Sequence, residues 1–93
     1  MKHEEVFRAL GDASRRRILK LLQRGSLNAG DIARHFDVSA PSVSHHLAVL
    51  KTSDLIRAER RGQNMVYSLN TSVVEDLTIF FSDILKNHRG TKK

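Results

Sequence analysis

The feature that most limits the fold of this chain is a pair of helix-start signals close together, at Asn28 and Ser39. Both residue types are preferred N-caps, because a side-chain oxygen accepts a hydrogen bond from a backbone N–H of the first turn. We therefore expect a short helix over about 29–36 and a second helix over about 40–52, joined by a tight turn at 37–38. Two short helices joined in this way form a helix-turn-helix.

The second helix is expected to have one apolar face and one polar face. Pro41 is tolerated in its first turn, where the missing N–H has no intrahelical partner. Its apolar residues are spaced i, i+4, i+7 and predict the face that packs on the core: Val43, Leu47 and Leu50.

The periodicity changes after this helix. Residues 55–59 and 65–69 favour two strands, and Met65, Tyr67 and Leu69 alternate with polar residues. The segment RRGQN at 60–64 is expected to form the tip of a hairpin, with glycine supplying the turn. The sequence therefore predicts a two-stranded wing over about 55–69 with a basic tip.

Three further helices are expected, over about 3–10, 13–24 and 72–88. The chain is then mainly α with a small β-hairpin, a winged helix-turn-helix of about five helices in one domain over 1–93. The last helix carries apolar residues on more than one face, which predicts that it packs on a partner as well as on the core. The alternative is that its own domain covers the whole helix. The apolar residues of this helix are Val73, Val74, Leu77, Phe80, Phe81, Ile84 and Leu85.

The charge of the chain favours a polyanionic partner. Sixteen Lys and Arg against ten Asp and Glu give a net charge of +6. The run Arg15–Arg17 opposes a helix dipole and suggests an anionic partner, the alternative being a solvated face. The low content of aromatic residues favours duplex DNA over single strands as that partner. The alternative explanation of the net charge is ordinary solubility. With neither a signal peptide nor an apolar span expected, we predict a soluble, cytoplasmic protein.

The adjacent histidines 45 and 46 invite a metal or catalytic interpretation, which helical geometry disfavours. Neighbouring residues on a helix do not face each other, so one site held by both is not expected. His45 lies opposite the apolar face and is predicted to contact DNA, or else to be a plain surface residue. His46 lies at the border of the core, where it packs and reaches a phosphate, or only packs. The chain has no cysteine and no nucleophile–base pair, so we expect neither enzyme activity nor a cofactor.

Three segments carry a resemblance to a known family: LGDASRRRILKLL, AGDIARHFDVSAPSVSHHLAVLK and RAERRGQNMVYSL. In order and spacing they resemble the ArsR family of bacterial winged-helix repressors. The resemblance implies a homodimer that binds an inverted repeat near its own promoter and represses transcription. It also implies an interface made by the first and last helices, here Val6, Leu10, Val73, Leu77, Phe80, Phe81 and Ile84.

Many members of that family sense metals, and this chain departs from both metal motifs. The two cysteine positions of one motif are Asn28 and Gly30, neither of which replaces a thiolate. In the second motif, Asp76 is followed by Leu77 and Thr78, and His88 stands alone. The chain therefore resembles the metal-free autorepressor (SdpR-like) branch. That branch implies release of the operator by a sequestering protein or membrane partner.

The expected DNA contacts divide into two groups. Base edges or the adjoining backbone are expected to meet Ala40, Pro41, Ser44 and His45. Phosphates are expected to meet Ser42, His46, Lys51, Arg60, Arg61 and Gln63. The alternative function is a protein-interaction module, which would not need the polar helix face and the basic wing.

Overall fold

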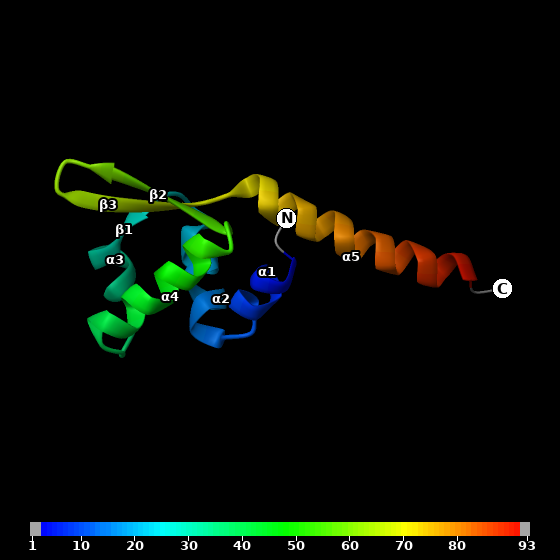
Figure 1. Ribbon diagram of the computed structural model, residues 1–93, viewed down its shortest axis with the longest axis horizontal. Coiled ribbons are helices and arrows are strands. Elements are labelled where there is room, and N and C mark those ends of the chain that lie inside the picture. Colours follow the sequence, from blue (N-terminus) through cyan, green and yellow to red (C-terminus); the bar gives the residue numbers. More distant parts are fainter. Residues whose placement is uncertain (1–2, 92–93) are drawn as a thin grey trace.

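The computed structural model of the chain describes residues 3–91, and their side chains except those at 87 and 89–91. The molecule is elongated, 57 × 25 × 22 Å, because the last helix, α5 (Thr71–Thr91), projects from a body made of the other elements (Figure 1). Among the described residues, no helix combines the length and apolar composition needed to cross a membrane.

The body begins with α1 (His3–Leu10) and α2 (Ala13–Leu22). Asp12 caps α2, since its carboxylate accepts from the backbone N–H of Arg15 at 3.1 Å. We expected α2 to reach residue 24. It ends earlier because the N–H of Gln23 bonds back to the carbonyl of Lys20, and Gly25 then turns the chain at φ +144°.

The helix-turn-helix consists of α3 (Ala29–Ala33) and α4 (Ala40–Thr52). The bounds of α4 match those expected, whereas α3 is three residues shorter. It ends early because the N–H groups of His35 and Phe36 bond three residues back, to Ile32 and Ala33, which tightens the chain out of the α-helix.

The end of α4 is a hydrogen-bonded cap that the sequence analysis did not predict. The N–H of Leu55 bonds to the carbonyl of Leu50, and the N–H of Asp54 bonds to that of Lys51, both within 3.1 Å. This is the Schellman pattern, and Asp54 takes the left-handed conformation at φ 66°. Leu50 and Leu55 are both fully buried, which locks α4 onto the core.

The sheet has three strands in the order β1-β3-β2, not the two that we expected. β2 (Ile56–Arg61) and β3 (Asn64–Leu69) form the antiparallel hairpin, and β1 (Leu27–Asn28) pairs with β3 at Tyr67 and Val66. A two-residue strand shows no alternation, so the pattern of the sequence could not indicate it.

One apolar core holds the body together. It lies between the helices and the inner face of the sheet, and α5 contributes a single buried residue to it. The members are Val6, Ala9, Ile18, Leu22, Ile32, Val43, Leu47, Leu50, Leu55, Ile56 and Leu77.

Candidate nucleic-acid interface

The start of α4 is capped as the sequence predicts. The hydroxyl of Ser39 accepts from the backbone N–H of Ser42 at 3.3 Å and donates to the hydroxyl of Ser42 at 3.1 Å. Pro41 lies in the first turn. The serine cap fixes the first turn of a helix whose outer face is open to solvent.

The outer face of α4 carries most of the residues that we expected to contact DNA. It lies opposite the buried residues Val43, Leu47 and Leu50. The exposed members of the predicted set on this helix are Ala40, Pro41, Ser42, Ser44, His45 and Lys51. All of them are free of the core and accessible to a ligand that approaches α4 from outside.

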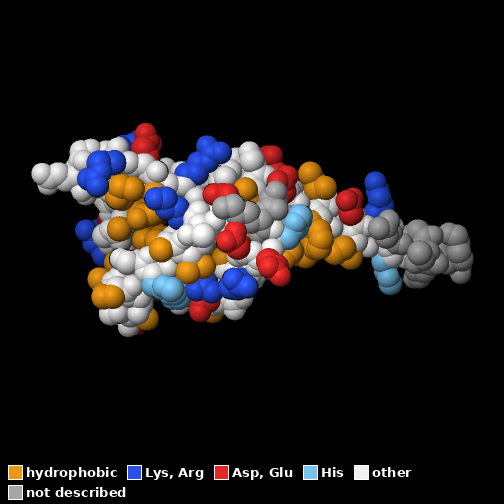
Figure 2. Space-filling model, viewed as in Figure 1, with side chains coloured by type: hydrophobic (Ala, Val, Ile, Leu, Met, Phe, Trp, Pro, Cys, Tyr) orange, Lys and Arg blue, Asp and Glu red, His pale blue; other side chains and the backbone are white. Residues whose placement is uncertain are grey.

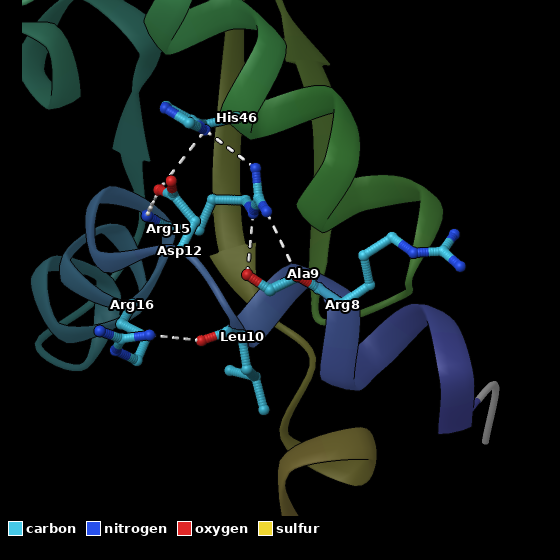
Figure 3. A network of polar contacts seen from close by, with 7 residues as sticks. All are labelled: Arg8, Ala9, Leu10, Asp12, Arg15, Arg16 and His46. Carbon is cyan, nitrogen blue, oxygen red and sulfur yellow. Dashed lines mark hydrogen bonds and ion pairs between the residues drawn. The ribbon is translucent and has the colours of Figure 1, made fainter.

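His46 is placed differently, because it faces the corner between α1 and α2 (Figure 3). Its side chain is 17% exposed. The Nδ1 atom lies 3.2 Å from Nη1 of Arg15 and 3.8 Å from Oδ2 of Asp12. The packing at the border of the core that we expected therefore describes His46, and its Nδ1 is engaged within the protein, while its contact with a phosphate stays a prediction.

The chemistry of Arg15 sets the tautomer of His46. A guanidinium only donates hydrogen bonds, so Nδ1 must accept, and the proton of the neutral ring is then on Nε2. The same guanidinium donates through Nε to the carbonyl of Ala9 at 2.8 Å and through Nη2 to the carbonyl of Arg8 at 3.2 Å. These two carbonyls belong to the last turn of α1, and that of Arg8 also accepts from the N–H of Gly11 at 3.1 Å.

The arginine run at the start of α2 makes contacts within the chain that we did not expect, and its binding of an anionic partner stays a prediction. Arg16 donates to the carbonyl of Leu10 at 2.7 Å and so caps α1 beside Arg15. Arg17 lies over the ring of Phe36, 4.8 Å from its centroid. The three cations satisfy groups of the chain itself. The partial negative charge at the carboxyl-terminal end of α1 also attracts the guanidinium groups of Arg15 and Arg16.

The environment of Asp12 favours its charged form. The hydrogen bond from the backbone N–H of Arg15 lowers the pKa of this carboxyl, opposed by partial desolvation and assisted by His46 and the Arg15 guanidinium. Asp12 therefore caps α2 as a carboxylate, at a point where the dipole of α2 also favours a negative charge.

The wing places its basic residues at the far end of the hairpin. Arg61 pairs with Asn64 across the strands, and Gly62 takes φ +63° at the first position of the two-residue turn between them. Arg60, Arg61 and Gln63 are exposed. Arg61 also forms an exposed ion pair with Glu59 at 3.1 Å, so Arg60 is the less restrained cation of the tip.

A second exposed surface is apolar and lies along α1 and α5. Figure 2 shows hydrophobic side chains gathered on α5 near the point where it leaves the body. The rings of Phe7, Phe80 and Phe81 are mutual neighbours, with centroids 5.3–6.3 Å apart. Phe81 is 50% exposed and Ile79 is 58% exposed. A patch of this kind is typical of a protein–protein interface.

Some members of the expected dimer set do not lie on this surface. Val6 is 0% exposed and Leu77 is 9% exposed, because both fill the core of their own chain. Leu10 and Val73 are half-buried against that core. The sequence analysis omitted Phe7, which is 37% exposed and contacts the rings of α5. The sequence could have indicated this residue, because it is an aromatic side chain next to Val6 on a helix that we expected at the interface.

The positions that correspond to metal ligands in the resembling family are occupied differently here. The Oδ1 atom of Asn28 accepts from the N–H of Asp31 at 2.8 Å and caps α3. Within the described residues, no three His, Asp or Glu side chains come close enough together to hold a metal ion.

The chain is similar to known regulators in both sequence and structure. The family model of bacterial regulatory proteins of the arsR family matches residues 12–58. The transcriptional repressor SdpR of Bacillus subtilis (strain 168) is 54% identical over 71 residues, which cover 76% of this chain and 79% of SdpR. These matches confirm the resemblance that the three sequence segments indicated.

Two solved structures share the fold. An ArsR-like transcriptional regulator from Rhodococcus sp. RHA1 has a TM-score of 0.86 at 24% identity, covering 95% of this chain and 81% of its own. The homodimeric winged helix-turn-helix DNA-binding domain Mb0332 of Mycobacterium bovis has a TM-score of 0.74 at 26% identity, covering 94% and 81%. With the family model matching half of its length and a relative 54% identical, this chain belongs to the arsR family of bacterial regulatory proteins.

Proposed function

We propose that this protein is a transcriptional repressor that binds duplex DNA as a homodimer, with α4 in the major groove. The observation that carries the proposal is the exposed polar face of α4 beside a hairpin with a basic tip, both built on one core. An α-helix fits the major groove, where each base pair shows a distinct set of donors and acceptors. SdpR is named a transcriptional repressor, which supports the direction of regulation.

The contacts follow from exposure. Ala40, Pro41, Ser44 and His45 meet base edges or the adjoining backbone. Phosphates are bound by Ser42, Lys51, Arg60, Arg61 and Gln63. His46 stays in this phosphate set through the N–H of Nε2, since only its Nδ1 atom is held by Arg15.

The homodimer in this proposal is formed by α1 and α5. The exposed apolar side chains there are Phe7, Ile79, Phe81, Ile84 and Leu85, with Phe80 half-buried among them. Burial of these side chains between two copies removes apolar surface from water. A two-fold dimer presents two α4 helices, so the operator is an inverted repeat with half-sites about one helical turn apart or a multiple of it. The homodimeric Mycobacterium bovis domain supports this assembly.

The regulated site in this proposal is the promoter of the protein's own operon. A sequestering protein or membrane partner that releases the repressor stays a prediction of the family resemblance alone.

Genome-wide capture of bound DNA tests the proposal, followed by fluorescence anisotropy on the recovered sites. We expect an inverted repeat that includes the upstream region of the gene itself. His45→Ala should weaken binding to that site by about 1–3 kcal/mol while changing random DNA little. Recovery of DNA without a shared two-fold motif contradicts the proposal.

The dimer is tested by sedimentation of Phe81→Glu beside the matched control Ser82→Glu. Both add one carboxylate to neighbouring exposed positions of α5, but only the first lies in the aromatic cluster. We expect Phe81→Glu to give monomers that lose operator binding and Ser82→Glu to remain dimeric. Equal dimerisation of the two variants contradicts this interface.

A further inference from the structure

A groove runs between α1 and the outer face of α4. Its volume is about 280 Å³, and its lining includes Glu5 and Arg8 from α1 and His45, Ala48 and Thr52 from α4. The residue that we expect to read bases, His45, therefore shares a surface with an arginine from a different helix.

Arg8 differs from most arginines of the described part of the chain in what its side chain does. The following arginine side chains each contact another group of the protein: Arg15, Arg16, Arg17, Arg34, Arg57 and Arg61. Arg8 is exposed and contributes its backbone carbonyl, not its guanidinium, to the polar network. In Figure 3 its side chain points away from that network.

One guanidinium holds Arg8 and His45 in place relative to each other. Arg15 donates to the carbonyl of Arg8 at 3.2 Å and to Nδ1 of His46, the neighbour of His45, also at 3.2 Å. The backbone that carries Arg8 and the helix that carries His45 are therefore joined through Arg15, across three helices.

We propose that Arg8 binds a phosphate of the DNA backbone beside the segment occupied by α4, so that the DNA-binding surface extends onto α1. This inference rests on the proposed function. A guanidinium presents several donors in a plane and suits a phosphate well, and none of the contacts described above uses the guanidinium of Arg8. Since α1 also belongs to the proposed dimer interface, the contacted phosphates lie toward the centre of the operator.

The test is operator binding across a salt series for Arg8→Gln, Arg8→Lys and Arg24→Gln. Arg24→Gln is the matched control, since Arg24 is an exposed arginine that lines a different hollow, beside Lys20 and His35. Arg8→Gln removes one contact per subunit, so the salt slope should fall by about 1.8 per dimer and binding at low salt by about tenfold. Arg8→Lys should keep most of the slope, and Arg24→Gln all of it.

Sedimentation at the same concentrations shows whether Arg8→Gln stays dimeric. The slopes are compared at protein concentrations where both variants are fully dimeric. Equal salt slopes for Arg8→Gln and Arg24→Gln then overturn the inference, even if Arg8→Gln dimerises more weakly. Glu5→Gln gives a check of sign, because removing a carboxylate from the same groove should strengthen binding. Weaker binding of both Arg8→Gln and Glu5→Gln would also overturn the phosphate contact. If the unaltered protein binds no operator DNA, in contrast, the proposed function itself is refuted.

Discussion

The two arginine clusters of this protein, at 15–17 and at 60–61, have the same chemistry and opposite surroundings. In the first, the guanidinium groups end on carbonyls of α1 or on the ring of Phe36. In the second, they stand at the tip of a hairpin, and one of them forms an exposed ion pair. The difference teaches that a basic run is weaker evidence for a partner when its guanidinium groups also have contacts within the fold.

The reason for this difference lies in the backbone groups that each cluster meets. The last turn of α1 presents carbonyls beyond the reach of the helix's own N–H groups, and Arg15 and Arg16 follow it closely enough in the chain to donate to them. The wing tip has backbone groups already paired across β2 and β3. Its side chains are consequently available to bind a partner.

The largest expected effect is on stability, from Arg15→Ala. The substitution leaves the carbonyl of Ala9 and the Nδ1 atom of His46 without their donor and removes one of the two donors to the carbonyl of Arg8. The free energy of unfolding should therefore fall by about 2–3 kcal/mol. Urea unfolding followed by circular dichroism measures this. Arg60→Ala is the control and should change stability by less than about 0.5 kcal/mol. Equal destabilisation of both variants would remove the distinction between the clusters.

The next effect is on DNA, from Arg60→Ala. Loss of one phosphate contact per subunit should weaken binding to specific and random DNA alike and reduce the salt slope by about 1.8 per dimer. Fluorescence anisotropy between low and moderate salt provides the measurement. An unchanged slope would show that the wing tip does not touch the backbone.

A smaller effect is expected from acid, through Asp12 beside Arg15. Because the pKa of Asp12 is lowered in the folded state, its contribution to stability is present above the pKa of the unfolded chain. That contribution is lost as the pH falls through the lower, folded value, so the window lies below about pH 4. Asp12→Asn keeps a capping oxygen and does not titrate. The stability difference between the two proteins should shrink on acidification, and a difference that grows would reverse the sign of this argument.

The smallest effect is expected from Arg17→Ala. An exposed cation over an aromatic ring contributes about 0.5–1 kcal/mol, so the variant should lose no more than that. Arg17→Lys keeps the charge but not the planar group and should recover part of the loss. The melting temperatures of the unaltered protein, Arg17→Ala and Arg17→Lys measure this contribution.

Local signals in the sequence predicted the helices and the hairpin because their causes are local. Ser39, Asn28 and Asp12 cap helices with their own side chains, and the alternation in 65–69 places the partly buried Tyr67 and Leu69 against the core. The winged helix-turn-helix class followed from these elements and is confirmed by the structural neighbours.

The parts that sequence reasoning missed depend on residues far apart in the chain. The bond between Arg15 and His46 spans 31 positions, and nothing near either residue indicates the other. Val6 and Phe7 are adjacent apolar residues, and only the packing of α1 decides that the first is buried and the second exposed. Strand β1 exists because β3 offers it an edge.

Asn28 belongs at once to β1 and to the cap of α3, since its backbone pairs with Val66 and its Oδ1 accepts from Asp31. Asn28 therefore connects the wing to the helix-turn-helix, in addition to the core on which both pack. The fold then sets the separation between the proposed groove contact of α4 and the proposed backbone contact of the wing. A fixed separation of this kind should favour duplexes whose groove width and phosphate spacing match it. The protein should therefore discriminate among duplexes by shape, also at base pairs that no side chain touches.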